Sequence, residues 1–290
     1  MAGEQQWLAE RFEEQRGHLR AVAYRMLGSL AEADDAVQDT WLRVSRSGAD
    51  DVENLSGWMT TILARVCLNV LRSRAVRREE SIGRELVDTV SAAPEEEVLL
   101  ADSVGLALLV VLETLTPAER LAFVLHDTFA VPFDEIAPIV GRSPAAARQL
   151  ASRARRRVRG GAALPGADLA RQRAVVTAFL AAARGGDFNA LIAVLDPDVV
   201  FRVDRTASGG PAALELRGAR VVAKNALAFS ERSRFTRPLI VDGSVGIVMA
   251  PGGRLLGVGR IVIREGRITE VDLIADPDRL AQLDLSVLDD

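Results

Sequence analysis

The chain of 290 residues contains few of the residues that build disulfides, metal sites or membrane spans. Cys67 is its single cysteine, so no disulfide can form within the chain and no multi-cysteine zinc site can be built. The two histidines, His18 and His126, are too scattered to suggest a metal-binding motif. No run approaches the roughly 20 apolar residues of a membrane span, and the N-terminal segment is polar and acidic, without an apolar signal region. We therefore expect a cytoplasmic protein that has no metal, no cofactor and no membrane anchor.

Lysine is almost absent, whereas arginine is concentrated in one stretch. Lys224 is the only lysine among 36 basic residues, and the net charge of −4 argues at first against a nucleic-acid partner. Seven arginines and no acidic residue nevertheless lie between Arg142 and Arg159, and acidic segments elsewhere hide this cluster in the total. The chain is long enough for two or three domains, and one of them can offer a basic surface to a polyanion.

The segment from Pro132 to Arg159 predicts two short helices joined by a tight turn at Gly141. Ser143 is placed to cap the second helix, and Pro144 fits its first position. Apolar residues at spacings of three and four predict one narrow buried stripe on that helix, made of Ala147, Leu150, Ala151, Ala154 and Val158. Residues that fall off the stripe are Arg148, Gln149, Ser152, Arg153, Arg155 and Arg156. This helix–turn–helix pattern suits the DNA major groove; the alternative is a solvated basic helix that packs by its alanine face.

The first part of the chain predicts amphipathic helices separated at Gly28 and Ser29. The helix expected over residues 31–45 has a polar face formed by Glu32, Asp34, Asp35, Gln38, Asp39 and Arg43. The helix expected over residues 57–74 aligns three polar residues on one face and ends in a basic patch. The aligned residues are Arg65, Asn69 and Arg72, and the patch is Arg72, Arg74, Arg77 and Arg78. Trp41 and Trp58 are either core residues or residues that stack on unpaired bases.

Residues 79–102 reverse the charge, with eight acidic residues against the single Arg84. This composition predicts an exposed linker, either a plain tether or an acidic segment that occupies a nucleic-acid channel. Helices resume at residues 104–115. A capping box from Thr116 to Glu119 then predicts a further helix over residues 117–128. Pro138 should bend the first helix of the helix–turn–helix.

The C-terminal half begins after a short boundary at residues 160–166. Helices are expected at residues 167–184 and 188–195. Strands are expected at residues 199–203, 239–241, 245–249, 255–263 and 268–274, with a helix at 219–230 between the first two. Helices followed by a meander of antiparallel strands predict an α+β domain whose sheet curls over helices.

The order of the N-terminal segments resembles a bacterial sigma factor of the extracytoplasmic-function (ECF) class of the sigma-70 family. The resemblance covers roughly residues 7–159 and is carried by DDAVQDTWLR, GWMTTILARVCLNVLRSR, the acidic linker and TPAERLAFVLHDTFAVPFDEIAPIVGRSPAAARQLASRARRRV. It implies that residues 1–78 form sigma region 2 and residues 103–159 form region 4, both all-α, joined by the linker 79–102. The implied partners are core RNA polymerase, through its β′ clamp and β flap, and promoter DNA.

The resemblance also implies roles for matching residues. Those that would face the β′ clamp are Asp35, Gln38, Asp39 and Arg43. Those that would contact the −10 element, where a base is flipped out of the stack, are Arg65, Asn69 and Arg72. Those that would read base edges at −35 are Arg148, Gln149, Ser152 and Arg153, with Arg155 and Arg156 on phosphates.

Residues 167–290 resemble the SnoaL-like family of cone-shaped α+β rolls, in the helix–GGD–helix–DPDVVFRVD opening and the terminal hairpins. Members of that family enclose a pocket; some are cyclases or isomerases with an Asp base, and many are catalytically silent. A subset of ECF sigma factors has such a C-terminal extension, which PGGR at residues 251–254 and DPDRL at residues 276–280 resemble. The chain lacks that subset's Trp-Leu-Pro-Glu-Pro stretch, of which only Leu164-Pro165 remains. The implied interdomain or regulatory residues are Arg254, Asp276, Pro277 and Asp278.

We therefore predict a sigma factor that is regulated by its own C-terminal domain and requires no separate anti-sigma factor. One alternative is a helix–turn–helix regulator that binds DNA without core polymerase. Another is a SnoaL-type enzyme with a DNA-binding anchor, for which Asp204 and Asp272 are the candidate bases. The C-terminal half contains no tyrosine or histidine that could assist, so we expect no catalytic residues there. A module that contacts the sigma domains and a pocket for a small ligand both stay open.

Overall fold

The computed structural model describes residues 2–47, 52–80, 105–159, 166–208, 212–233, 235–251 and 254–288. Its contacts divide the chain into two compact units. The first comprises Met1–Ile82 and Leu115–Arg155, and the second comprises Gly83–Thr114 and Arg156–Asp290. The expected acidic linker from residue 81 onward, and residues 160–165 of the short linker, lie outside the described residues.

The first unit begins with three helices, α1 (Ala2–Leu27), α2 (Leu30–Ser47) and α3 (Leu55–Glu80). Gly28 separates α1 from α2 with a φ of 76°, a left-handed conformation that glycine adopts without strain. The apolar stripes expected from the sequence meet in one core. Its fully buried members include Phe12, Leu19, Val22, Met26, Val37, Met59 and Leu63. The expected helices and their break are therefore confirmed.

The same unit continues with α6 (Pro117–Phe123), a π-helix η2 (Val124–Thr128), α7 (Phe133–Val140) and most of α8 (Pro144–Arg159). The capping box forms as expected, because the hydroxyl of Thr116 accepts from the Glu119 N–H while the Glu119 carboxylate accepts from the Thr116 N–H. Gly141 ends α7 with a φ of 69°, and the Ser143 hydroxyl accepts from the Ala146 N–H at 3.3 Å. The helix expected over residues 117–128 differs in one respect, since its second half is wound as a π-helix.

The second unit contains a seven-stranded sheet in the order β2-β1-β6-β5-β4-β3-β7. The strands are β1 (Leu195–Val203), β2 (Leu214–Arg217), β3 (Thr236–Val241), β4 (Ser244–Met249), β5 (Gly257–Arg264), β6 (Arg267–Ile274) and β7 (Leu285–Ser286). The helices are α5 (Leu106–Thr114), α9 (Gly166–Gly185), α10 (Phe188–Val194), α11 (Arg205–Ser208), α12 (Ala219–Ala228), α13 (Ser230–Ser233) and α14 (Pro277–Leu280). The short strands β2 and β7 are absent from the sequence-based expectation, because two to four residues leave too little alternation to recognise.

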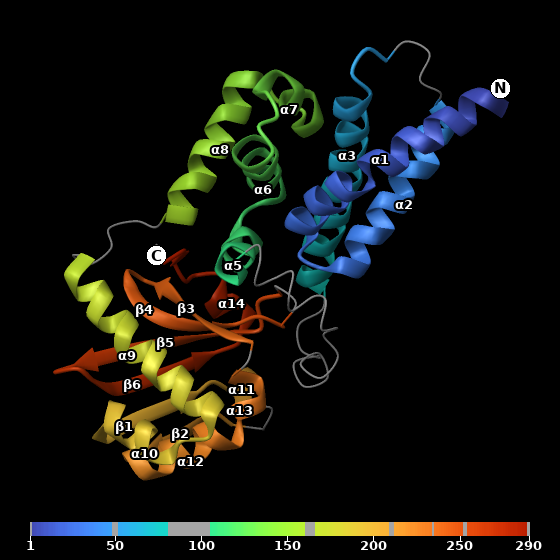
Figure 1. Ribbon diagram of the computed structural model, residues 1–290. Coiled ribbons are helices and arrows are strands. Elements are labelled where there is room, and N and C mark those ends of the chain that lie inside the picture. Colours follow the sequence, from blue (N-terminus) through green and yellow to red (C-terminus); the bar gives the residue numbers. More distant parts are fainter. Residues whose placement is uncertain are drawn as a thin grey trace. The chain divides into compact units, whose positions relative to one another are not determined.

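One strand pair corrects the expected antiparallel meander. β1 runs parallel to β6, whereas the other neighbouring strands pair antiparallel. Figure 1 shows α9, α10 and α12 against one face of this sheet, where they contact β1 and β4. The core between them is apolar and includes Val176, Phe179, Leu191, Val199, Phe201, Val222, Val245, Ile261 and Val271. The predicted α+β roll is confirmed, with a mixed sheet.

Candidate nucleic-acid interface

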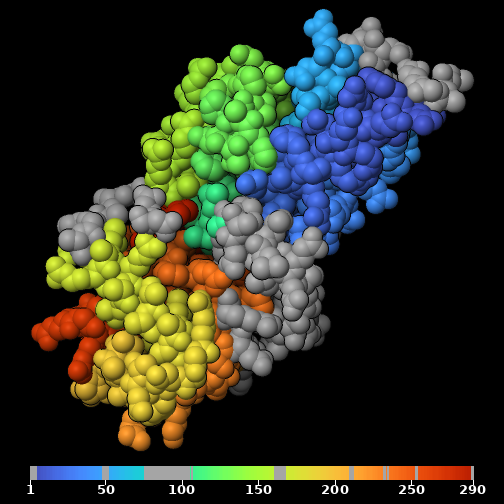
Figure 2. Space-filling model, viewed as in Figure 1, coloured from blue at the N-terminus to red at the C-terminus, as the bar shows by residue number. Residues whose placement is uncertain are grey.

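Helix α8 separates a buried alanine stripe from an exposed polar face. Ala147, Ala151 and Ala154 are fully buried and Leu150 is nearly so, as the spacing predicted. The exposed side chains are Arg148, Gln149, Ser152, Arg153 and Arg156, and that of Arg155 is half-buried. In the space-filling view, α7 and α8 lie at the surface in light green (Figure 2). The polar face of α8 is therefore exposed to solvent in the first unit.

Three of the arginines on α8 have partners on other elements of the first unit. The Nε of Arg153 lies 3.2 Å from the Glu119 carboxylate of α6, and the Nε of Arg155 lies 2.6 Å from the Asp127 carboxylate of η2. Arg148 instead lies over the ring of Phe133, with 5.4 Å between its guanidinium carbon and the ring centre. The sequence of α8 alone contains no acidic residue, so these pairs could not be expected from it.

The face of α3 that was predicted to contact the −10 element is exposed. Arg65, Asn69 and Arg72 project from it, and within the described residues none of them has a side-chain partner. Cys67 points to the opposite, buried side, and burial raises the pKa of its thiol to about 12. Helix α3 thus has a buried core stripe on one side and an exposed polar stripe on the other.

Arg74 does not belong to the basic patch in which the sequence analysis placed it. Its guanidinium pairs with the Glu32 carboxylate of α2 and donates at 2.9 Å to the carbonyl of Leu27, at the C-terminus of α1. It therefore joins α3 to the turn between α1 and α2. The side chains of Arg77 and Arg78 lie outside the described residues.

The polar face of α2 is smaller than its sequence suggests. Glu32 is paired with Arg74, and Asp34 accepts two hydrogen bonds from Arg20 at 2.7 and 3.2 Å. The exposed residues that remain are Asp35, Gln38, Asp39 and Arg43, with 3.5 Å between Asp39 and Arg43. Leu42 joins this face with 42% of its surface exposed, and the sequence analysis did not single it out. Its position outside the apolar stripe of α2 is the sequence feature from which its exposure could have been predicted.

Trp41 and Trp58 are partly buried among helices. Trp41 packs on Phe12 with 5.1 Å between the ring centres, and Trp58 is half-buried on α3. Their packing in the first unit favours the interpretation as core residues.

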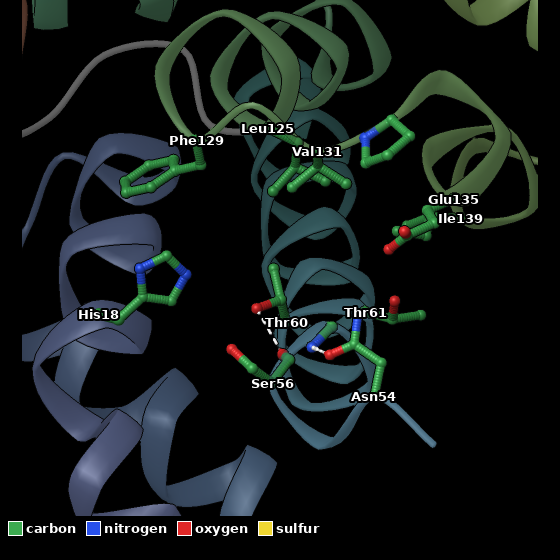
Figure 3. Close-up of a pocket in the computed structure, with 12 residues that line it drawn as sticks. His18, Asn54, Ser56, Thr60, Thr61, Leu125, Phe129, Val131, Glu135 and Ile139 are labelled. Atoms are coloured by element: carbon green, nitrogen blue, oxygen red, sulfur yellow. Dashed lines mark hydrogen bonds between the residues drawn. The ribbon is translucent and has the colours of Figure 1, made fainter. Parts of the chain in front are cut away.

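Region 2 and region 4 helices meet directly within the first unit. The guanidinium of Arg120 in α6 is 4% exposed and donates at 2.9 Å to the Met26 carbonyl at the end of α1. A hollow of about 250 Å³ lies at the same junction, between α1, the start of α3, and η2 with α7 (Figure 3). One wall is polar, with Asn54, Ser56, Thr60 and Thr61; the other is largely apolar, with Leu125, Phe129, Val131 and Ile139. The Asn54 side chain caps α3 at 3.0 Å, and the Thr60 hydroxyl donates to the Ser56 carbonyl at 2.8 Å, so these polar groups serve the helix itself.

The candidate bases of the roll are engaged in structural contacts. Asp204 accepts from the N–H groups of Ala207, Ala275 and Asp276 at 2.8 to 3.0 Å. Its carboxylate also lies 3.6 Å from Arg279, so Asp204 fastens α14 and the end of β6 to the end of β1. Three of the roughly four lone-pair sites of this carboxylate thus accept from backbone N–H groups, which gives Asp204 a structural role.

Asp272 lies in a network of charges on the exposed face of the sheet. Arg202 contacts Glu270 at 2.9 Å, Glu215 at 3.1 Å and Asp272 at 3.4 Å. These hydrogen bonds raise the pKa of Arg202, that from Glu270 contributing most. The guanidinium groups of Arg217 and Arg202 lower the pKa of Glu215. Within the described ranges, no group of three or more histidine, cysteine or carboxylate side chains is placed to hold a metal ion.

The predicted regulatory residues lie in two short segments of the second unit. Asp276 caps α14 by accepting from the N–H groups of Asp278 and Arg279, while Pro277 and Asp278 are exposed. Arg254 is exposed, and the N–H of the next residue, Leu255, donates at 2.7 Å to the Glu113 carboxylate of α5. The Arg254 motif therefore adjoins a helix that the sequence analysis assigned to region 4.

The comparisons with known proteins identify the family. The family models described as Sigma-70 region 2 and Sigma-70, region 4 match residues 12–77 and 105–158. The chain is 37% identical over 286 residues to "ECF RNA polymerase sigma factor SigJ" of Mycobacterium tuberculosis (strain ATCC 25618 / H37Rv), which covers 92% of this chain and 91% of that protein. It is 32% identical over 281 residues to "Probable ECF RNA polymerase sigma factor SigI" of Mycobacterium tuberculosis (strain CDC 1551 / Oshkosh), with 92% and 93% covered. The crystal structure of Mycobacterium tuberculosis SigJ is similar with a TM-score of 0.43 at 32% identity, over 93% of this chain and 97% of that one.

The chain belongs to the ECF class of RNA polymerase sigma factors. The resemblance noted in the sequence is thereby confirmed, and a helix–turn–helix regulator that works without polymerase is disfavoured. No helix in the part of the chain that the structure describes is both long and apolar enough to span a bilayer.

Proposed function

We propose that this sigma factor directs core RNA polymerase to promoters through three exposed surfaces, and that its C-terminal unit controls when they become available. The β′ clamp would bind the α2 face of Asp35, Gln38, Asp39 and Arg43, to which the exposed Leu42 adds an apolar contact. Region 4, residues 103–159, would bind the β flap. An acidic face with one apolar residue suits a basic partner surface with an apolar centre.

The −10 element would be read by Arg65, Asn69 and Arg72 of α3, whose side chains are exposed on one face. At the −35 element, Arg148, Gln149 and Ser152 of α8 would approach base edges. Arg153 and Arg155 must exchange their carboxylate partners for DNA, whereas Arg156 has no such partner among the described residues and suits a phosphate.

The first unit as it stands is a closed form that cannot read a promoter. Its helix α3 packs against α6 and α7, so both readers belong to a body of about 120 residues with a radius of gyration of about 14 Å. DNA rises about 3.4 Å per base pair, so elements named −10 and −35 are separated by about 85 Å along the duplex. Region 2 and region 4 must therefore separate before both elements are contacted, and the Arg120–Met26 contact must break.

The packing of helix α5 is the main support for the regulatory proposal. It belongs to the stretch matched by the region 4 model, yet it packs against β3 and β7 of the roll. Glu113 of α5 binds the Leu255 N–H, and at the other end of region 4 the Val158 carbonyl accepts from the Val287 N–H at 2.9 Å. Arg157 further lies 3.5 Å from the Thr114 carbonyl. The roll thus binds both ends of region 4 and is suited to restrain its movement.

We further infer that the roll is a protein-contact module rather than an enzyme, because Asp204 and Asp272 are engaged in structural contacts. Among the implied regulatory residues, Asp276, Pro277 and Asp278 belong to α14 and its cap, which Asp204 holds, whereas Arg254 directly precedes Leu255, the partner of Glu113. A small ligand of the roll and independence from an anti-sigma factor stay predictions.

Run-off transcription with purified core polymerase tests the proposal. The full chain should support promoter-specific transcripts. Ending the chain after Ala275 removes Val287, which binds the end of α8, and β7, which packs against α5. We expect transcription to rise several-fold, because the roll then restrains region 4 less. Removing residues 167–290 takes away the whole roll and leaves the apolar α5 uncovered. Comparing the two truncated chains then distinguishes a roll that restrains region 4 from a roll that supports its structure. If both truncated chains transcribe like the full chain, the roll does not regulate the sigma regions.

A further inference from the structure

The arginines of α8 have two different kinds of partner. Arg153 and Arg155 form ion pairs that occupy guanidinium N–H groups, whereas Arg148 lies over the ring of Phe133. A cation–π contact uses the positive charge of the guanidinium and does not consume its N–H donors. Arg148 is therefore restrained in position while its donors stay available for a base.

Besides Arg148, the ring of Phe133 contacts the ring of His126. The two rings stack with centres 3.8 Å apart and planes 29° from parallel. The Nδ1 of His126 lies 3.0 Å from the Val131 carbonyl, and since a carbonyl only accepts, Nδ1 carries the hydrogen in this contact. His126 belongs to the π-helix η2, and π-helical turns are frequent at functional sites. A continuous stack thus runs from η2, through the first residue of α7, to the exposed face of α8.

We propose that Phe133, supported by His126, is a positioning residue that sets the base preference of Arg148. The proposal rests on the proposed function, in which Arg148 reads base edges at −35. A bidentate arginine–guanine contact requires the guanidinium edge in a narrow range of orientations. Restraining a flexible arginine before DNA arrives reduces the conformational entropy that is lost on binding.

Holoenzyme assembled from the full chain and core polymerase tests this, with promoter fragments randomised over the −35 segment as the probe. Phe133→Leu keeps an apolar side chain for α7 but removes the ring, and Phe133→Tyr keeps the ring. We expect Arg148→Ala to abolish the preference at one base position. Phe133→Leu should weaken the preference at that same position by about two- to five-fold, the range of an exposed cation–π contact, and Phe133→Tyr should retain it.

Phe129 provides a matched control in the same unit. Arg25 lies over its ring at 5.1 Å and His18 contacts its edge at 5.3 Å, which is a comparable arrangement away from α8. Phe129→Leu should lower the melting temperature about as much as Phe133→Leu while the selected −35 sequences stay unchanged. The slope of log affinity against log salt should also be the same for Phe133→Leu and the unmodified chain, because no phosphate contact is lost.

These outcomes distinguish an error in the −35 role of Arg148 from an error in the positioning role of Phe133. If Arg148→Ala leaves the selected sequences unchanged, the −35 role of Arg148 is wrong and the positioning role falls with it. If Arg148→Ala changes them and Phe133→Leu does not, the positioning role alone is wrong. In an Arg148→Ala background, Phe133→Leu should have no further effect on preference. A loss of preference at other −35 positions in that background indicates a general effect on α8 and overturns the proposal.

Discussion

The carboxylate of Glu113 in α5 accepts a hydrogen bond of 2.7 Å from the backbone N–H of Leu255, in the segment before β5. α5 lies within the stretch that the region 4 model matches, whereas Leu255 directly follows the Arg254 motif of the C-terminal roll. A hydrogen bond to an ionised acceptor is stronger than one between neutral groups. This pair therefore gives the roll a direct hydrogen bond to the first helix of region 4.

Removing that bond should activate the sigma factor. Glu113→Ala leaves the Leu255 N–H without this acceptor, at a cost of about 1–3 kcal/mol to the docked position of α5. We expect run-off transcription to rise several-fold, because region 4 then separates from the roll more readily. Glu113→Gln is the matched control: it retains an acceptor oxygen and should transcribe near the level of the unmodified chain. Equal transcription by Glu113→Ala and the unmodified chain would contradict the restraint by α5.

Reversing the charge on α2 should abolish polymerase binding. Asp35 and Asp39 are exposed, so replacing both by lysine changes the charge of the surface without disturbing the core. We expect the Asp35→Lys, Asp39→Lys chain to lose core enzyme in a pull-down assay while its circular dichroism is unchanged. Glu14→Lys, an exposed acid on α1, is the control and should bind normally. Retained binding by the double variant would place the clamp contact elsewhere.

Arg153 and Arg156 should differ in their effects on stability. Arg153→Ala removes the ion pair with Glu119, whose side chain is only 8% exposed. We expect the free energy of unfolding to fall by about 1 kcal/mol, the upper range for a pair whose arginine is solvent-exposed. Arg156→Ala removes no ion pair or ring contact among the described residues and should unfold like the unmodified chain in the same denaturant titration. The reverse order of stabilities would show that the ion pair is not the source of the difference.

Cys67 should make the stability of the first unit depend on alkaline pH. Burial raises the pKa of its thiol to about 12, so the folded chain retains a proton that the unfolded chain releases near pH 9. The corresponding stability is fully present below pH 9 and is lost as pH rises toward 12, by about 1.4 kcal/mol per pH unit. Cys67→Ala should flatten this loss in denaturant titrations between pH 8 and 10. At pH 8 a thiol reagent should label the unfolded chain and spare the folded one; rapid labelling of the folded chain would contradict the burial.

Much of the helical architecture could be predicted because its signals are local. The Thr116–Glu119 capping box, the Gly141 turn and the alanine stripe of α8 each depend on residues within a few positions of one another. The same holds for the exposed face of Arg65, Asn69 and Arg72, which follows from helical periodicity alone.

The partners of the charged side chains could not be predicted in the same way, because these side chains pair across elements. The basic face of α8 was predicted without acidic partners, yet Glu119 and Asp127 of neighbouring elements reach Arg153 and Arg155. Arg74 was assigned to a surface patch and instead joins three helices through Glu32 and Leu27. Electrostatic partners depend on distance in space, which periodicity does not supply.

The sequence by itself determined the longer helices, the Thr116–Glu119 capping box, the helix–turn–helix and the ECF sigma family, because these depend on short-range patterns and on the order of motifs along the chain. Only the tertiary structure decided that β1 runs parallel to β6, that Arg155 is paired with Asp127 and that α5 docks on the roll. The decisive hydrogen bonds join residues 28 to 142 positions apart. Such contacts form only when the folded chain has already brought distant elements together, and their free energy offsets a loop-closure entropy that local sequence does not reveal.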